Sequence, residues 1–146
     1  MIIYLGIGTN LGNREDNLHK ALCLLDERIG EQLVCSSIYR SKPQGFESEN
    51  EFANLVVVYQ TVYSPEEVLL ITQEIEREMG RTQKSVNGVH YDRIIDIDLL
   101  WAKIGTLSLD RNTETLTLPH PRMYERDFVM VPLREVEQQL QYIDNQ

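Results

Sequence analysis

Arg93-Ile94-Ile95-Asp96-Ile97-Asp98-Leu99-Leu100-Trp101 is the segment around which the rest of the chain can be arranged. Branched apolar residues dominate it, which is typical of a strand buried in a core. Side chains alternate between the two faces of a strand, so Asp96 and Asp98 share one face, with their Cα atoms roughly 6.5–7 Å apart. The other face is expected to carry Ile95, Ile97, Leu99 and Trp101.

Two carboxylates this close, partly withdrawn from water, repel each other unless a cation neutralises them. Mg²⁺ suits such a pair, because it keeps several waters and takes one or two carboxylates plus substrate phosphates. Two such ions about 3.5–4 Å apart can hold both the attacking and the leaving oxygen of a phosphoryl transfer. The motif alone equally allows both aspartates to face water on the open side of an antiparallel sheet.

Length and charge narrow the class of protein. The chain has 146 residues, enough to bury a proper core, and we expect a single domain over 1–146. The net charge of −9 disfavours a general nucleic-acid or membrane-surface binder, whose contact face would be basic. It does not exclude a nucleotide ligand, because local cations can outweigh the overall sign.

The two cysteines indicate a reducing compartment. Cys23, in an expected helix, and Cys35, in an expected strand, lack the spacing of a metal site and are interpreted as half-buried reduced thiols. The chain opens directly into an apolar strand without a cationic lead, and no apolar run is long enough to span a membrane. We therefore expect a cytoplasmic protein.

The N-terminal segment predicts a strand, a glycine-rich turn and a helix. Residues 2–7 form the strand, and the glycines of 6–12 resemble a dinucleotide fingerprint whose last gap is one residue too long. A tight strand-to-helix turn is the alternative. Asn13 is expected to cap a helix that ends at Gly30 and carries apolar residues at helical spacing, namely Leu18, Ala21, Leu22, Leu25 and Ile29.

Residues 33–40 and 52–62 predict the second and third strands, joined by a polar loop over 41–51. A loop of that length in a compact domain is often functional. The third strand has one face formed by Phe52, Asn54, Val56 and Val58 and another formed by Ala53, Leu55, Val57 and Tyr59. Asn54 can either bind the polar edge of a flat ligand or tie down the adjacent loop.

Ser64 is expected to begin the second helix, since proline follows it and Glu67 completes a capping box. Gly80 ends this helix. The loop over 81–92 carries Arg81, Lys84 and His90, and it can either fold over an anion or simply be solvated.

The remaining segments complete the topology. A hairpin is expected around Gly105, a short strand at 116–118, and a helix over 124–136 that breaks or restarts at Pro132. The order β-α-β-β-α-β predicts an α+β, ferredoxin-like fold with a mostly antiparallel sheet, two helices on one face and an appended strand and helix. The first and third strands would be central. Whether the Asp-x-Asp strand lies beside the first or the second strand stays open.

Five segments occur in a familiar order. They are Gly8-Thr9-Asn10-Leu11-Gly12, Tyr39-Arg40-Ser41-Lys42-Pro43-Gln44-Gly45, Phe52-Ala53-Asn54, Arg93 to Leu100, and Pro119-His120-Pro121-Arg122-Met123 continuing through Arg126, Phe128 and Pro132-Leu133. Over nearly the whole chain this resembles the 6-hydroxymethyl-7,8-dihydropterin pyrophosphokinase family. Those folate-pathway enzymes move pyrophosphate from ATP to a pterin alcohol.

The resemblance implies roles for particular residues. Asp96 and Asp98 would hold two Mg²⁺ ions that bridge the phosphates of ATP. The nucleotide would be positioned by Gln73, Glu76, Arg93, the backbone at Leu99, Thr117 and His120, with Arg126 on the phosphates. The pterin would lie between Phe52 and Phe128, while its polar edge would meet Asn54 and the backbone around Ser41, Pro43 and Gln44.

The chemistry agrees with those roles. Phosphoryl-type transfer needs positioning and charge neutralisation more than covalent chemistry. Phosphate oxygens could be met by the donors of Arg81, Lys84, Arg93 and Arg126. No strong general base is evident, and we hypothesise that Asp98 also orients the pterin hydroxyl.

Three positions depart from the family pattern. Tyr91-Asp92 stands where a small pair such as Gly-Pro is common, and Gln83 where a second arginine is frequent, so Lys84 would have to replace that contact. Tyr124 stands in place of a histidine.

Other classes of protein fit less well. An RNA-recognition domain would show paired aromatics and a basic face, and an amino-acid sensor would need no metal carboxylates. A nucleotidyltransferase would place its glycine pair shortly before the aspartates, and a dinucleotide oxidoreductase would need a parallel sheet. We therefore expect small-molecule substrates, no nucleic acid and no membrane contact, with a monomer as the default.

Overall fold

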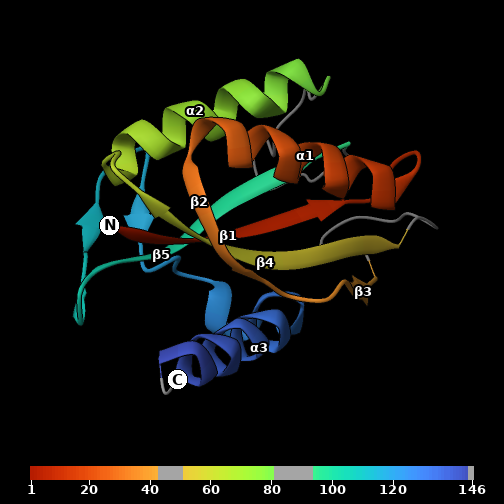
Figure 1. Cartoon of the computed structure of the whole chain (residues 1–146). Coiled ribbons are helices and arrows are strands. Elements are labelled where there is room, and N and C mark those ends of the chain that lie inside the picture. Colours follow the sequence, from red (N-terminus) through yellow and green to blue (C-terminus); the bar gives the residue numbers. More distant parts are fainter. Residues whose placement is uncertain (43–50, 81–93, 145–146) are drawn as a thin grey trace.

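A computed structural model of the chain describes residues 1–42, 51–80 and 94–144. It has three layers: two helices, a sheet, and a third helix on the opposite face (Figure 1). In chain order the elements are β1 (Ile2–Thr9), α1 (Arg14–Arg28), β2 (Gly30–Cys35), β3 (Tyr39–Ser41), β4 (Phe52–Thr61), α2 (Pro65–Glu78), β5 (Asp96–Ile104), β6 (Leu107–Ser108), β7 (Arg111–Asn112), β8 (Thr117–Leu118), the 3₁₀ turn η1 (Met123–Glu125) and α3 (Asp127–Asp144).

The sheet confirms the predicted α+β class and strand order. Its strands run β2-β4-β1-β5-β6, all neighbours are antiparallel, and β3 also pairs with β4. The first and third predicted strands, β1 and β4, are central as expected. The strand with the two aspartates, β5, lies beside β1, which resolves the question that the sequence left open.

The predicted strand over 33–40 is wrong in its limits, because two strands occupy this region. β2 already begins at Gly30, and the chain leaves the ladder after Cys35 before it returns as β3. At this point the Ser36 N–H still donates to the Val56 carbonyl at 2.9 Å, but the Val56 N–H donates to the Ser36 hydroxyl Oγ, also at 2.9 Å, and not to a main-chain carbonyl. The ladder is therefore interrupted without leaving a buried N–H unpaired.

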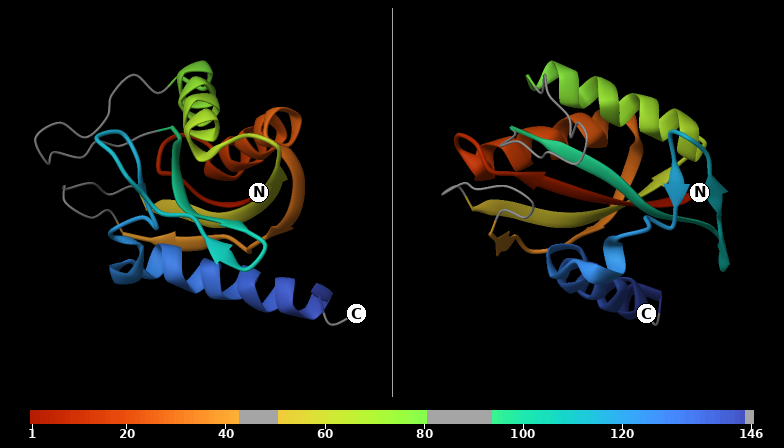
Figure 2. Two further views of the ribbon diagram at one scale, coloured as in Figure 1. Left: turned by 90° about the vertical axis from the view of Figure 1, so that its left-hand side faces the viewer. Right: turned by 180° about the vertical axis from the view of Figure 1, so that it is seen from behind.

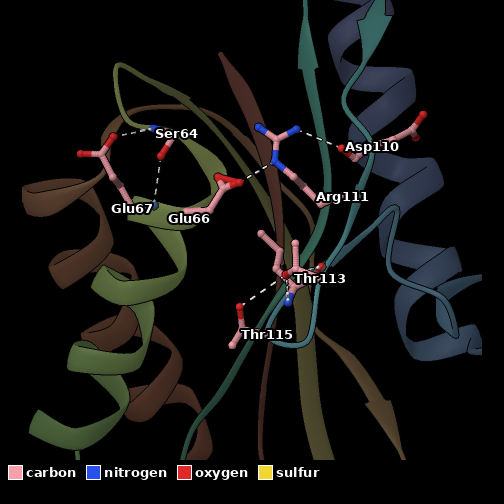
Figure 3. Close-up of polar contacts among 8 residues, drawn as sticks. Ser64, Glu66, Glu67, Asp110, Arg111, Thr113 and Thr115 are labelled. Atoms are coloured by element: carbon pink, nitrogen blue, oxygen red, sulfur yellow. Dashed lines mark hydrogen bonds and ion pairs between the residues drawn. The ribbon is translucent and has the colours of Figure 1, made fainter.

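Helix α2 begins as the sequence predicted. The Ser64 hydroxyl accepts the N–H of Glu67, and the Glu67 carboxylate accepts the N–H of Ser64 (Figure 3). The preceding residue, Glu66, accepts a hydrogen bond from Arg111 Nε at 2.5 Å, which ties this helix to β7. Helix α1 likewise begins at Asn13, whose side chain accepts the N–H of Asp16.

Two hydrophobic cores lie on opposite faces of the sheet. The upper core, between the sheet and helices α1 and α2, includes Leu5, Ile7, Leu25, Leu55, Val57, Ile75, Ile97 and Leu99. The lower core, between the sheet and α3, includes Tyr4, Val56, Val58, Leu100, Val129, Leu133 and Val136. The predicted division of β4 into two faces is confirmed, and Figure 2 shows α3 on the side of the sheet opposite α1 and α2.

A β-bulge corrects the expected face of Trp101. Leu5 pairs with Leu99 and Tyr4 with Trp101, so Leu100 is an extra residue that shifts the alternation. Trp101 consequently packs in the lower core against Tyr4, with ring centroids 5.0 Å apart, instead of sharing a face with Leu99.

The C-terminal helix is longer than expected and does not break at Pro132. After η1, α3 runs unbroken from Asp127 to Asp144 with the proline inside it. Pro132 is the sixth residue of the helix, so its missing N–H deprives only the carbonyl of Phe128 of a helical partner. Burial of Val129 and Leu133 beside it offsets that loss.

The smaller predictions have mixed outcomes. The hairpin around Gly105 is confirmed by the pairing of β5 with β6. Both cysteines are free, but Cys23 is exposed rather than half-buried. Burial raises the pKa of the Cys35 thiol to about 11, so it stays protonated near neutral pH. In the described parts of the chain, no helix has the length and apolar character that crossing a bilayer requires.

Candidate active site

Three central strands bring candidate residues into one row. Asn54 on β4, Gly8 on β1 and Asp96 on β5 are successive partners across the sheet. Strands lie about 4.8 Å apart, so the Asn54 and Asp96 backbones are separated by roughly 10 Å. The next row contains Val56, Gly6 and Asp98.

Both aspartates face the lower side of the sheet. Ile95, Ile97 and Leu99, which alternate with them, are buried in the upper core. Asp96 and Asp98 are therefore directed toward the face that α3 partly covers, and each remains partly exposed. The predicted shared face of the two aspartates is thereby confirmed, and their role as metal ligands stays a prediction.

Gly6 and Gly8 on β1 leave room that side chains of the neighbouring strands β4 and β5 occupy. A Cβ added to Gly8 would lie 2.9 Å from Oδ1 of Asn54 and 3.7 Å from the Phe52 ring. A Cβ added to Gly6 would lie 3.3 Å from the Leu100 side chain. The sequence predicted a glycine-rich turn over 6–12, whereas Gly6 and Gly8 lie within β1. Their spacing of two residues puts both glycines on the same face of this strand.

Asn54 is buried, and its side chain ties down the neighbouring segment, which is one of the two roles that the sequence allowed. Its Nδ2 donates to the Ser41 hydroxyl at 2.9 Å and to the Tyr39 carbonyl at 3.3 Å, which fixes β3 against β4. Its Oδ1 is directed toward Gly8. Phe52 is on the same strand face and pairs in register with Ser41, so these predicted pterin contacts lie together.

His120 is held beside β5 by its backbone. Its N–H donates to the Leu100 carbonyl at 2.8 Å, and its Nδ1 accepts the N–H of Arg122 at 3.2 Å. In the neutral ring the proton must therefore be on Nε2, which is left as the donor. Burial lowers the pKa of His120, the charge of Arg126 lowers it further, and the charge of Asp96 opposes both.

Arg126 directly precedes α3, and Phe128 is the second residue of that helix. The Arg126 guanidinium carbon is 5.5 Å from the centroid of the Phe128 ring, within the range of a cation–π contact. Phe128 is half-buried and packs on the edge of the lower core. The segment thus places a cation and an aromatic ring on the same side of the sheet as the aspartates.

The predicted nucleotide residues are found at the outer edge of β5. Glu76 on α2 is buried, and its Oε2 accepts the backbone N–H of Ile97 at 2.8 Å. Gln73, one turn earlier on α2, is half-buried. Thr117 lies on β8, which packs beside β5. Five predicted site residues fall outside the described residues: Pro43, Gln44, Arg81, Lys84 and Arg93; so do the departures at Gln83 and Tyr91-Asp92.

Known proteins resemble this chain along most of its length. A family model described as 7,8-dihydro-6-hydroxymethylpterin-pyrophosphokinase (HPPK) matches residues 4–138. A 2-amino-4-hydroxy-6-hydroxymethyldihydropteridine pyrophosphokinase of Porphyromonas gingivalis is 47% identical over 135 residues, covering 92% of this chain and 90% of that protein. The protein of the same name from Bacillus subtilis is 40% identical over 141 residues, covering 96% and 80%.

The fold also has a solved counterpart. A crystal structure of HPPK-DHPS in complex with substrates aligns with a TM-score of 0.67 and 18% identity over 92% of this chain. The aligned part is 40% of that longer chain, so the likeness concerns the fold of one part of it.

The α+β domain and its relatives define an ATP-dependent diphosphotransferase. The chain belongs to the 7,8-dihydro-6-hydroxymethylpterin-pyrophosphokinase family, whose members act in folate synthesis. The resemblance stated from the sequence is thereby confirmed.

Proposed function

We propose that this protein transfers the terminal diphosphate of ATP to the hydroxymethyl group of 6-hydroxymethyl-7,8-dihydropterin. The hydroxyl oxygen attacks the β-phosphorus, the bond from that phosphorus to the oxygen bridging the α- and β-phosphates breaks, and AMP leaves. The hydroxyl proton passes to water. The observation that carries this proposal is the row Asn54–Gly8–Asp96, which sets a carboxylate across a bare glycine from an amide.

The two aspartates fit a pair of Mg²⁺ ions. Asp96 and Asp98 offer only oxygen donors, share one face, and pair with Gly8 and Gly6, which project no side chains of their own beside them. Among the residues with described positions, no group of three or more His, Cys, Asp or Glu could hold a metal. Phosphate and water oxygens would complete the shell, as Mg²⁺ prefers. When bound, the ions would neutralise phosphate charge and align the reacting oxygens.

ATP would bind along the outer edge of β5. Backbone groups alternate in direction along a strand, so the N–H of Leu99 points the same way as that of Ile97, away from β1. That backbone can pair with the edge of an adenine ring, with Gln73 and Thr117 nearby on their own elements. His120 Nε2 and the Arg126 guanidinium would donate to phosphate oxygens.

The pterin would lie between β4 and the start of α3. Phe52 and Phe128 provide two aromatic faces, which bury a flat heterocycle with little loss of conformational freedom. Ser41 and Asn54 supply polar groups at the β4 side. The hydroxymethyl group would then point toward Asp98, which orients the hydroxyl without having to act as a strong base.

The products test the proposal. Incubation with ATP, Mg²⁺ and 6-hydroxymethyl-7,8-dihydropterin should release AMP and the pterin diphosphate in equal amounts. Release of ADP would mean that the γ-phosphorus is attacked and would contradict the proposal. Titration calorimetry with a non-hydrolysable ATP analogue should show binding that strengthens with Mg²⁺, and metal-independent binding would argue against the aspartate role.

The setting of the reaction is also part of the proposal. We expect a monomer working in the cytoplasm, in keeping with two free cysteines. Light scattering at micromolar concentration should give the mass of one 17.0 kDa chain.

A further inference from the structure

We propose that Glu76 is a positioning residue for the two aspartates, acting through the backbone of the strand that carries them. The carboxylate of Glu76 accepts the N–H of Ile97, the residue between Asp96 and Asp98, at 2.8 Å. This bond joins α2 to β5 across 21 residues of sequence. The inference rests on the proposed function, because it gives the aspartates their role as metal ligands.

The bond stands where a neighbouring strand would otherwise be. On its inner side β5 pairs with β1 from Asp96 onward, whereas on its outer side β6 pairs only at Lys103 and Ile104. Among the described strands, none pairs with the outer edge at Ile97. The Glu76 carboxylate therefore takes the place of a main-chain carbonyl at this point of the edge.

Successive N–H groups point to opposite sides of a strand, so this bond restrains the backbone between the two aspartates. Ile97 points its N–H outward to Glu76, so the amides of Asp96 and Asp98 point inward toward β1. The short segment is thus held from both sides: the aspartates by the central strand, and the residue between them by α2. Their side chains are left to project from the lower face at a fixed spacing.

Burial indicates that the contact is specific. Glu76 is 5% exposed, and an ionised carboxylate at such a site is costly unless it is hydrogen-bonded. A bond from a backbone N–H to a carboxylate is charge-assisted and stronger than a neutral one. Removing a group that orients metal ligands through hydrogen bonds typically weakens metal binding by about 10–100-fold.

The test compares three variants of the whole protein. Glu76→Ala removes the acceptor, Glu76→Gln keeps an oxygen that can accept the same N–H, and Glu74→Ala removes an exposed glutamate from the same helix. Mn²⁺ binding is measured by electron paramagnetic resonance with a non-hydrolysable ATP analogue present. Amide hydrogen exchange at Ile97 is measured without ligand, and thermal unfolding by circular dichroism checks that each variant is folded.

We expect Glu76→Ala to speed exchange at Ile97 and to weaken Mn²⁺ binding about tenfold. Glu76→Gln should stay within about threefold of the wild type in both measurements. Glu74→Ala should give the same values as the wild type. Faster exchange at Ile97 with unchanged Mn²⁺ binding would overturn the inference.

Two other outcomes would also overturn it. If Glu76→Gln behaved like Glu76→Ala, the charge and not the bond would matter. If both variants lost nucleotide affinity equally without metal, Glu76 would contact the nucleotide directly. Wild-type protein that bound no Mn²⁺ with the analogue would refute the proposed function itself, and that result is distinguishable because it involves no variant.

Discussion

At the scale of single residues, the two faces of β5 carry side chains of different kinds. Its apolar side chains hold the strand in the upper core, while Asp96 and Asp98 project from the other face. Because the packing comes from Ile95, Ile97 and Leu99, an aspartate can be replaced without opening a cavity. The carboxylates can therefore be tested separately from the fold.

Asp98→Ala should lower turnover by orders of magnitude and leave the melting temperature nearly unchanged. The reason is that one of the two carboxylates proposed to hold the magnesium ions is lost while the core beneath is untouched. Steady-state AMP release measures the effect, and Asp110→Ala, at an exposed position beyond the hairpin, serves as the control. Near-normal activity in Asp98→Ala would remove the metal role.

Phe128→Ala should weaken pterin binding by about threefold to tenfold and affect ATP much less. The ring would contribute stacking of about 0.5–1.5 kcal/mol to the pterin alone. Calorimetry with each ligand separately measures the two affinities, with Tyr142→Ala, an exposed aromatic later in α3, as the matched control. Equal losses for both ligands would argue against an aromatic slot.

His120 should make stability depend on pH in a defined window. Its pKa in the folded protein lies below the value near 6.5 of an unfolded chain, chiefly because of burial. As the pH falls below about 6.5 the unfolded chain takes up the proton first, so the free energy of unfolding decreases until the folded pKa is reached. Above that window the contribution is fully present.

Urea unfolding at pH 7.5 and 5.5 measures this effect. The wild type should lose more stability between the two values than His120→Gln does. His19→Gln, at an exposed position on α1, should behave like the wild type. Identical losses in wild type and His120→Gln would show that the buried ring does not titrate as inferred.

At the scale of elements, two irregularities of the sheet set the positions of Trp101 and of β3. The bulge at Leu100 turns Trp101 into the lower core, where its Nε1 donates to Ser108 Oγ at 2.7 Å and secures the β5–β6 hairpin. The break at Ser36 lets β3 return beside Asn54. A regular sheet would have neither feature.

Ser64→Ala should destabilise the protein by about 1 kcal/mol, because the N–H of Glu67 loses its acceptor at the start of α2. Ser64→Gly should cost only a few tenths of a kcal/mol, since glycine is tolerated at this position. Chemical denaturation followed by circular dichroism measures both. A larger loss for glycine than for alanine would contradict the capping explanation.

At the scale of the whole molecule, the site depends on both layers around the sheet. The C-terminal end of β1 and the N-terminal ends of β4 and β5 lie together at one end of the sheet. Helix α2 contacts β5 from above, and α3 lies below the sheet (Figures 1 and 2). Glu76 contacts β5 from the upper side of the sheet and Phe128 packs on the lower side, so the proposed site draws on both layers. We therefore expect the two cores to unfold as one domain.

Leu133→Ala in the lower core and Ile75→Ala in the upper core should each cost about 2–5 kcal/mol, because both side chains are at least 95% buried. Each should shift one and the same transition, seen both by far-UV circular dichroism and by fluorescence of the single tryptophan, Trp101. Separate transitions by the two probes would mean that α3 and the lower core unfold independently.

Residues near one another in the chain were enough to predict much of this protein. Alternation identified the strands and the shared face of Asp96 and Asp98, and the capping sequence after Ser64 located α2, because these patterns depend on local backbone geometry. The motif order was enough for the family. The roles given to the site residues stay predictions, and Arg81, Lys84, Arg93, Pro43 and Gln44 also lie outside the described residues.

Tertiary contacts decided what local patterns could not. The partner of β5, the bulge that moves Trp101, the continuation of α3 through Pro132, and the bond from Glu76 to Ile97 all depend on groups far apart in sequence. The need for glycine at position 8 becomes visible only once β4 brings Asn54 beside it. Such features depend on which surfaces pack together. A one-residue shift in strand pairing, or a buried neighbour, changes how stable a given local structure is although the local sequence stays the same.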